Sequence, residues 1–579
     1  MRGNKPVAGT IAKLGAACAI GALIVGSSHA RADEASDALL DVLKAKGEIT
    51  QAEYDKIKAR QQAEAKDSTQ KLQAAEARAH EAEAKAKEAE AKADEAAAKA
   101  QSDSAEVAKV KAQTLTAADI PMPAKAPPLE YVTALKKCVG IRIGEVDVCF
   151  KGDLVFFGIE TFPDKSLNKA PVSGGAAVLA QTNANSIGAG LLPSSFSISA
   201  NTTQNGIDIS FLVGLYTGGS NVSQGLPFNA NDNAPGGVPI ALGTPGIDFR
   251  QVFGTLGTPT FGTVKIGRDL GLFGSDAILN DLTLFGVGSV GGVSSWAPGN
   301  TTNGRIGIGY IYADWIPQIT YKTPSFGGFT ATFGVFTPLD NVDVFGFFAG
   351  GDSAVLTAHT APMLQGQVKY VGDWGGGTKL TLSADGLWEH QTCDNTEPTT
   401  VGFANGGFPL GTASAVCSTT PGDGFVQQGQ DFNPWAVDGF AMLDWWGFNF
   451  VAYGYTGQGV GTAGLFVDGV DIFGNMRRSD GGYGQIAYTF AGTGFTVGGS
   501  WGVSELHRTA EEASEFNPVG EAINGLLVHT NESWIGFARY QLTKWVMLQA
   551  EYTHTRSWNQ EGDPAITNDT IAIGTDFFW

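Results

Sequence analysis

The chain has 579 residues, with 58 acidic and 38 basic side chains and a formal net charge of −20 at pH 7. Its length exceeds that of most single domains, so we expect at least two architectural parts. The acidic balance gives no reason to expect a nucleic-acid partner. Glycine accounts for 78 residues, about twice its average share of roughly 7%.

Residues 1–32 have the three parts of a secretory signal peptide. A basic region is followed by an apolar stretch at 14–25 and by small residues at two cleavage options, after Ala30 or after Ala32. The apolar stretch is too short to cross a membrane as a helix. We therefore predict that the chain is exported.

Residues 33–113 are rich in Ala, Glu and Lys and are predicted to be helical. A heptad pattern runs from Leu72 to Val110, and eleven of its twelve seam positions are apolar, eight of them alanine. We expect a coiled coil in the periplasm, although a solitary helix remains an alternative because alanine is also common off the seam. An alanine seam buries little area, so association would need help from another part of the molecule.

Residues 114–137 are predicted to be a linker. Pro121, Pro123, Pro127 and Pro128 cannot continue a helix and favour an extended path. The linker separates a charge-balanced first part from a second part that carries the whole acidic excess.

Residues 138–579 show alternation of apolar and polar side chains, the period of a β-strand. The clearest strands are 378–389, 434–445, 545–555 and the last nine residues. In the last nine, an apolar face runs to the terminal Trp579, which suits a strand that faces lipid and ends at the membrane interface. Weaker strands are predicted to begin near Phe150, Ser195, Ile207, Ile247, Phe261, Ile306, Pro317, Phe329, Gln365, Phe448, Tyr483, Phe495 and Ser533.

These candidates number sixteen or seventeen, and bacterial barrels of this type have an even number of strands. The expected fold is therefore an all-β transmembrane barrel of about sixteen antiparallel strands, preceded by an α-helical coiled-coil extension. No stretch after residue 32 is long and apolar enough for a membrane helix. Long segments rich in Gly, Asn, Pro and Ser are predicted to be external loops.

Four cysteines remain after export: Cys138, Cys149, Cys393 and Cys417. An even number in an exported chain indicates two disulfides. Proximity in the sequence favours Cys138–Cys149 and Cys393–Cys417, while three pairings are open in principle. No cluster of Cys and His indicates a metal, and we expect neither a cofactor nor catalysis.

Three stretches resemble the trimeric porins of the Gram-negative outer membrane. Residues 261–268 look like the strand that leads into the constriction loop of those proteins, and 319–330 look like a hairpin found in them. The terminal 577–579 are similar to the aromatic signal that the barrel assembly machinery recognises. Separately, 39–58 are similar to the leading segment of phosphate- and dicarboxylate-type porins.

The resemblance implies a homotrimer in which residues 269–304 fold into the barrel and narrow it. Asp276 and Asp281 would then enter the lumen and face basic side chains on the wall, which would create a field across the pore. The alternative is that such charges are merely solvated in a wide, wet barrel. The candidate pore-lining residues are Arg250, Arg268, Asp276, Asp281, Arg305, Lys322 and Arg539.

The predicted function is passive diffusion of small hydrophilic solutes and ions across the outer membrane. The barrel would contact outer-membrane lipid and lipopolysaccharide. One alternative is a channel selective for anions such as phosphate or dicarboxylates. A second is an envelope tether, in which the helical segment engages peptidoglycan and the barrel serves as an anchor.

Overall fold

The structure is a computed structural model of the chain, which separates into two units, residues 1–126 and 127–579. It describes residues 132–135, 137–217, 247–290, 301–341, 353–394, 417–422, 424–514 and 525–579, together with Lys44, Lys46, Asp55 and Lys58. The predicted signal peptide, coiled coil and tether lie outside the described residues, as does most of the predicted linker.

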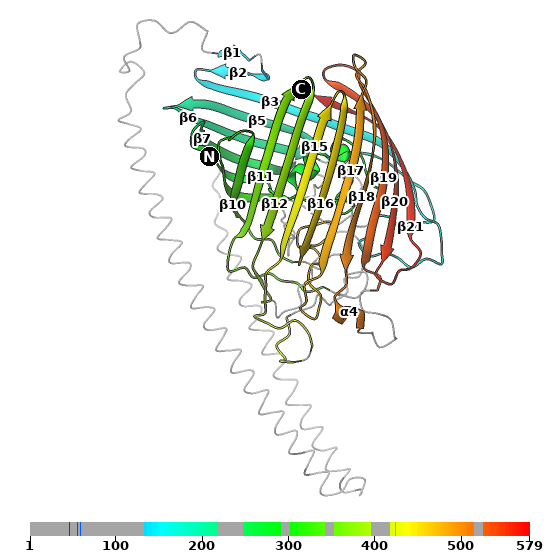
Figure 1. Ribbon diagram of the computed structural model, residues 1–579. Helices are drawn as coiled ribbons and strands as arrows, with labels where there is room; N and C mark the ends of the chain where they lie inside the picture. The colour runs from blue at the N-terminus through cyan, green and yellow to red at the C-terminus, as the bar shows by residue number, and fades with distance from the viewer. Residues whose placement is uncertain are drawn as a thin grey trace, which may run out of the picture. The chain divides into compact units, whose positions relative to one another are not determined.

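Sixteen antiparallel strands form a closed ring (Figure 1). Closure joins the last strand to the first, with register partners that run from Asp569 and Phe162 to Phe578 and Asp153. The predicted number of strands is therefore confirmed. In chain order the strands are β3 (Val146–Phe162), β5 (Ser194–Gln204), β6 (Ile207–Thr217), β7 (Ile247–Thr258), β8 (Gly262–Leu270), β9 (Trp315–Lys322), β10 (Phe329–Phe336), β11 (Met363–Gly375), β12 (Thr378–Trp388), β15 (Trp435–Trp445), β16 (Phe448–Gln458), β17 (Arg478–Thr489), β18 (Phe495–His507), β19 (Val528–Gln541), β20 (Val546–Asn559) and β21 (Ile566–Phe578).

The strand predicted near Ile306 is wrong. Ile306 lies in the long connection between β8 and β9, where it makes an isolated bridge to Tyr310. Ile306 and Ile308 are both buried in the main hydrophobic cluster, so their alternation with glycine reflects packing of a loop rather than a strand.

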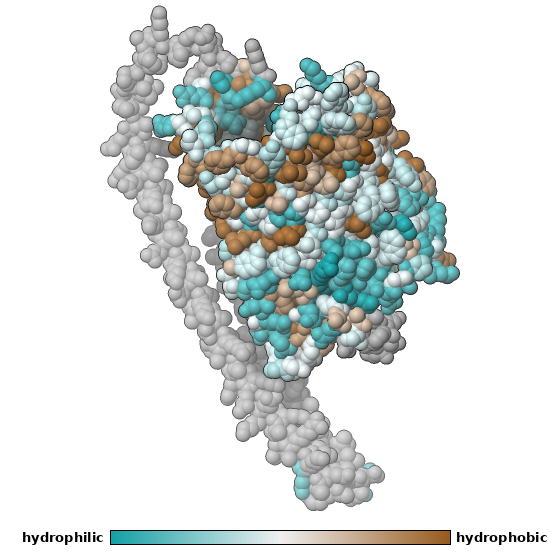
Figure 2. Space-filling model, viewed as in Figure 1, coloured by the Kyte–Doolittle hydropathy of each residue, from teal (hydrophilic) through white to brown (hydrophobic). Residues whose placement is uncertain are grey.

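The two faces of the strands differ in polarity. Ile573 of β21 is 66% exposed, whereas the neighbouring Ala572 and Asp576 are buried. In β12, Leu382 is exposed and Asp385 is buried on the opposite face. On the side shown in Figure 2, apolar side chains gather over the strands and hydrophilic ones toward the long loops. The barrel is therefore apolar outside and polar inside.

The two ends of the ring also differ. One end has short turns, such as Asn205–Gly206 between β5 and β6, where both residues have the positive φ that two-residue hairpins require. The other end has the long connections, including the one between β8 and β9. In the parts of the chain that the structure covers, no helix is both long and apolar enough to cross a membrane.

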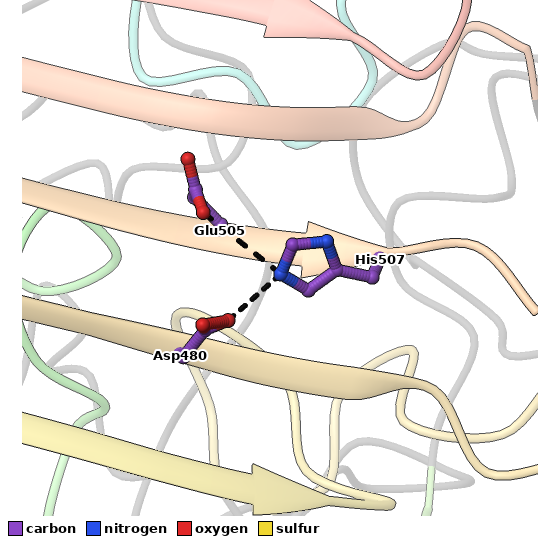
Figure 3. A group of neighbouring side chains, drawn as sticks. All are labelled: Asp480, Glu505 and His507. Atoms are coloured by element: carbon purple, nitrogen blue, oxygen red, sulfur yellow. Dashed lines mark hydrogen bonds and ion pairs between the residues drawn. The ribbon is translucent and has the colours of Figure 1, made fainter.

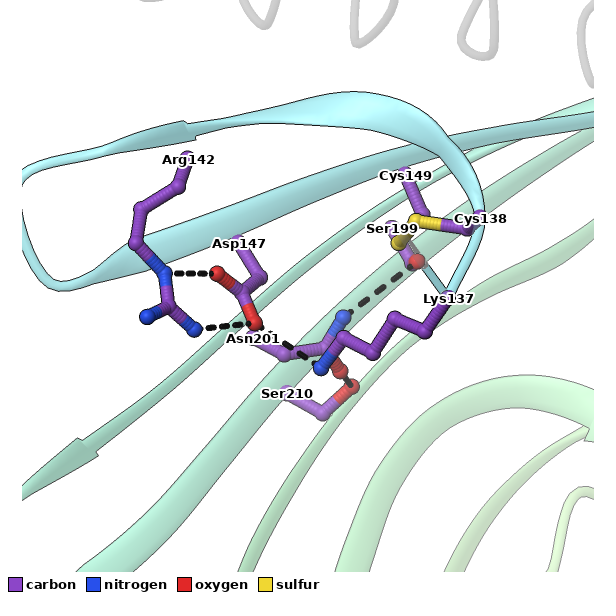
Figure 4. The surroundings of a disulfide bond; sticks show 8 residues. All are labelled: Lys137, Cys138, Arg142, Asp147, Cys149, Ser199, Asn201 and Ser210. Carbon is purple, nitrogen blue, oxygen red and sulfur yellow. Dashed lines mark hydrogen bonds and ion pairs between the residues drawn. A yellow bond between two sulfur atoms is a disulfide. The ribbon is translucent and has the colours of Figure 1, made fainter. Parts of the chain in front are cut away.

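Both predicted disulfides are present, in the pairing that proximity favours. Cys393–Cys417 lies in a small hydrophobic cluster of the long connections, together with Val426 and Phe432. Cys138–Cys149 joins the start of the strand β2 (Val139–Ile143) to β3 (Figure 4). Cys393–Cys417 thus braces the long connections at one end of the barrel. Cys138–Cys149 braces the seam, where the last strand, β21, meets the first, β3.

The seam carries an additional hairpin. The strand β1 (Val132–Ala134) pairs with β2, and β2 pairs with the first residues of β3. Just beyond this pairing, Gly152 of β3 exchanges two backbone hydrogen bonds with the terminal Trp579. β2 therefore continues along the same edge of β3 that β21 occupies.

Candidate functional site

The described parts of the connection between β8 and β9, residues 271–290 and 301–314, fold into the barrel and are called the inward loop here. It contains the helix α3 (Ser275–Asn280) and the 3₁₀ turn η2 (Leu282–Phe285). Its backbone amides donate hydrogen bonds to side chains on four different strands. The acceptors are Gln365 of β11, Asp438 of β15, Gln485 of β17 and Glu551 of β20, at 2.5–2.9 Å.

These bonds explain why the loop stays inside. Backbone N–H groups away from water need acceptors, and a buried unpaired donor costs about 1–3 kcal/mol. The inward face of the alternating strands is polar and supplies those acceptors. The described parts of the loop are thus fixed to the far wall of the barrel.

Asp276 of α3 meets a base on the wall. The Nζ of Lys369, on β11, donates to Asp276 Oδ1 at 2.5 Å, and the Gln367 amide approaches the same carboxylate at 3.3 Å. The Asp276 side chain is 6% exposed and the Lys369 side chain 28%. An acid on the loop and a base on the wall are therefore in direct contact.

Asp281 and Arg305 are both buried within the inward loop. Asp281 accepts hydrogen bonds from the Thr283 amide and from the Tyr310 hydroxyl. Arg305 Nε is 3.9 Å from Asp281 Oδ1, and Arg305 Nη1 donates to Ser533 Oγ on β19 at 3.1 Å. This pair holds the loop together and against the wall, and neither residue faces open water.

Arg539 of β19 is a wall base in contact with the loop. Its guanidinium donates to the Leu282 carbonyl of η2 and to Gln549 Oε1 of β20. The Gln549 amide in turn donates to the Phe285 carbonyl and to Asp576 of β21. Arg539 thus belongs to a polar network that joins the loop to three neighbouring strands.

Arg250 of β7 lies on the side of the inward loop opposite Arg539. Its side chain is buried, and its guanidinium lies 5.2 Å from the centre of the Tyr216 ring. Together with Gln251, Thr302 and Trp315 it lines a cavity of about 230 Å³. The cavity is bounded by the inward loop and by β6, β7 and β9.

The structure does not bring Arg268 and Lys322 to the loop–wall contact. Arg268 lies between Val252 and Pro317 in the ladder, on the outward face that Val252 and Ile266 share. Lys322 is exposed at the short-turn end of β9. The alternation of polar and apolar residues indicates which face of a strand a side chain is on, but it does not indicate how close Arg268 or Lys322 lies to the inward loop.

Two wall carboxylates were missed by the sequence prediction. Asp385 of β12 and Asp438 of β15 are register partners, and both are nine-tenths buried or more. Asp438 accepts from the Gly274 amide and from the Tyr453 hydroxyl. Both aspartates lie on the polar face of a predicted strand, and that alternation is the signal that could have found them.

No family model and no curated protein matches the chain. Among solved structures, it is similar to the outer-membrane channel DcaP of Acinetobacter baumannii, with 12% identity and a TM-score of 0.49, over 77% of this chain and 99% of that one. An anion-selective porin from Comamonas acidovorans matches with 12% identity and a TM-score of 0.43, over 75% and 100% of the two chains. OmpF of Salmonella typhi matches with 12% identity and a TM-score of 0.41, over 75% and 98%.

Proposed function

We propose that the chain is an outer-membrane porin through which small hydrophilic solutes and ions diffuse passively. The observation that carries the proposal is a closed ring of strands, apolar outside and polar inside, narrowed by a loop that is hydrogen-bonded to the wall. A closed ring leaves no backbone group unpaired at a sheet edge, which is what a lipid environment requires. The polar interior then supports a water-filled path.

The proposed pore prefers cations. The barrel part of the sequence carries the whole acidic excess of the chain, and Lys369 and Arg539 are bases that touch the inward loop from the wall. An excess of one sign of charge in a low-dielectric enclosure raises the local concentration of the opposite ion.

Planar bilayers containing the purified full-length protein test this function. We expect stepwise ohmic currents, and in a KCl gradient a reversal potential on the cation-selective side. A protein that inserts as a folded barrel without conducting would contradict the pore. A strong anion preference would retain the pore and contradict its proposed selectivity.

One observation favours an anion-selective channel as the second candidate. Arg250 is a buried cation in the wall of a cavity that also presents Gln251 and Thr302, and such a group is suited to a phosphate or carboxylate. If this candidate is right, phosphate or succinate reduces the KCl current at submillimolar concentrations, and Arg250→Gln removes the effect. Equal currents with and without these anions would exclude it.

A further inference from the structure

Three side chains with metal-ligating atoms meet where β17 and β18 border the long connections. Asp480 of β17 and Glu505 and His507 of β18 each contribute one atom, and these atoms lie within 4.8 Å of one another. His507 Nε2 is 2.7 Å from Asp480 Oδ2 and 3.9 Å from Glu505 Oε2. Figure 3 shows the imidazole nitrogen directed toward both carboxylates. We call this group the rim triad.

The rim triad is on the outside of the barrel. Glu505 and His507 alternate with Leu506, which is 1% exposed and faces inward, and they share their face with the exposed Trp501. β18 ends at His507, so the triad lies at the end of the ring that carries the long connections. It is therefore separate from the inward loop and from the proposed path of solutes.

The backbone register places the two carboxylates in an unfavourable arrangement. Asp480 and Glu505 are direct partners in the antiparallel ladder, and like charges directly opposite each other destabilise a sheet. Arg478 Nη2 is 2.8 Å from Asp480 Oδ1, but the Arg478 side chain is 59% exposed, so solvent screens this pair. A cation held between the two carboxylates would relieve their repulsion.

The ligand types indicate which cation fits. Ca²⁺ takes six to eight oxygen ligands, and Mg²⁺ requires octahedral oxygen coordination. One imidazole and two carboxylates instead form a set that suits Zn²⁺, which binds nitrogen and oxygen ligands at about 2.0–2.2 Å in four-coordinate sites. The His507 ring also packs edge to face against His529 of β19, with centroids 5.4 Å apart. This contact restricts the orientation of the ring.

We propose that the rim triad is a Zn²⁺ site, with Asp480, Glu505 and His507 as three ligands and water as the fourth. His507 binds through Nε2 as the neutral imidazole with its proton on Nδ1. Small rotations of the three side chains bring their donor atoms around one ion, because these atoms already converge. The site bridges β17 and β18, and its existence does not depend on the proposed pore.

Titration calorimetry on the full-length protein in detergent, stripped with EDTA and dialysed, tests the site. We expect ZnCl₂ to bind with one ion per chain at micromolar affinity, and CaCl₂ and MgCl₂ to give no heat at the same concentrations. Asp480→Asn, Glu505→Gln and His507→Gln should each weaken Zn²⁺ binding by at least about tenfold. Co²⁺ should give d–d absorption bands with the wild type that His507→Gln abolishes.

The matched control is His554→Gln. His554 of β20 forms a pair with Asp569 of β21, with Nδ1 2.8 Å from Oδ1 and an exposed side-chain fraction of 35% against 33% for His507. It should retain full Zn²⁺ affinity. A wild-type far-ultraviolet circular dichroism spectrum verifies that each variant is folded. The proposal is overturned if the wild type does not bind Zn²⁺, if the three triad variants bind it as well as the wild type, or if the control loses as much affinity as they do.

Discussion

Replacing Gly502 of β18 by alanine tests how closely the inward loop packs on the wall. A Cβ atom at Gly502 would lie 2.4 Å from Arg305 Nη1 and 2.4 Å from the Ile308 carbonyl oxygen, which is too close for real contacts. Both atoms belong to the loop, and Arg305 is fully buried, so it has no open space to move into. Overpacking of this kind costs about 1–3 kcal/mol, and we expect Gly502→Ala to lower the free energy of unfolding by that amount.

Two measurements follow the change. Thermal unfolding in detergent, monitored by circular dichroism or by loss of the folded band on electrophoresis, should show a lower midpoint. Single-channel recordings should show altered conductance, because the displaced loop changes the narrowest part of the lumen.

The matched control is Gly484→Ala on the neighbouring strand β17. A Cβ atom there would meet no other atom within 4 Å, so stability and conductance should stay at their wild-type values. If Gly502→Ala behaves like Gly484→Ala in both assays, the loop is not packed against β18 and the reasoning fails.

Three further predictions concern charge and covalent bonds. Lys369→Met removes the partner of Asp276, so reversal potentials in a KCl gradient should shift toward cation selectivity, and an unchanged potential would contradict the ion pair. Replacing Cys393 and Cys417 by serine opens a loop of 24 residues and should lower stability by about 3 kcal/mol on chain-entropy grounds, measured by thermal unfolding. Burial raises the pKa of Glu389 to about 7. The neutral carboxyl therefore contributes its full stability below about pH 4.5, and this contribution is lost as the pH rises through 7. Glu389→Gln should make the free energy of unfolding less dependent on pH over that window, as measured by thermal unfolding.

The sequence predicts the barrel well because alternation is a local signal. Leu382, Ala384 and Asp385 show both faces of β12 without any knowledge of its neighbours. The error at Ile306 has the same cause. Every residue from 302 to 314 is buried, and the glycines at 307 and 309 alone give the sequence its apparent alternation with Ile306, Ile308 and Tyr310.

The site is harder to predict because it depends on register. Asp276 and Asp281 could be assigned to the inward loop, but the identity of their partners could not. Lys369 contacts Asp276 only because α3 packs against β11 in this position. The register of β6 and β7 shifts next to Arg250, and the sequence gives no signal of that shift. The rim triad illustrates the same limit, since its carboxylates come from different strands and no local cluster of residues in the sequence predicts a metal site.

The seam has a consequence for the order in which the barrel assembles. β2 and β3 are adjacent in the chain, so their hairpin and the Cys138–Cys149 bond need no other strand and can form before the ring closes. The pairing of β21 with β3 instead joins the two ends of the barrel sequence, and such distant contacts form slowly. We therefore expect the hairpin to form before the ring closes, and the pairing of β21 with β3, which includes the two hydrogen bonds between Trp579 and Gly152, to form last.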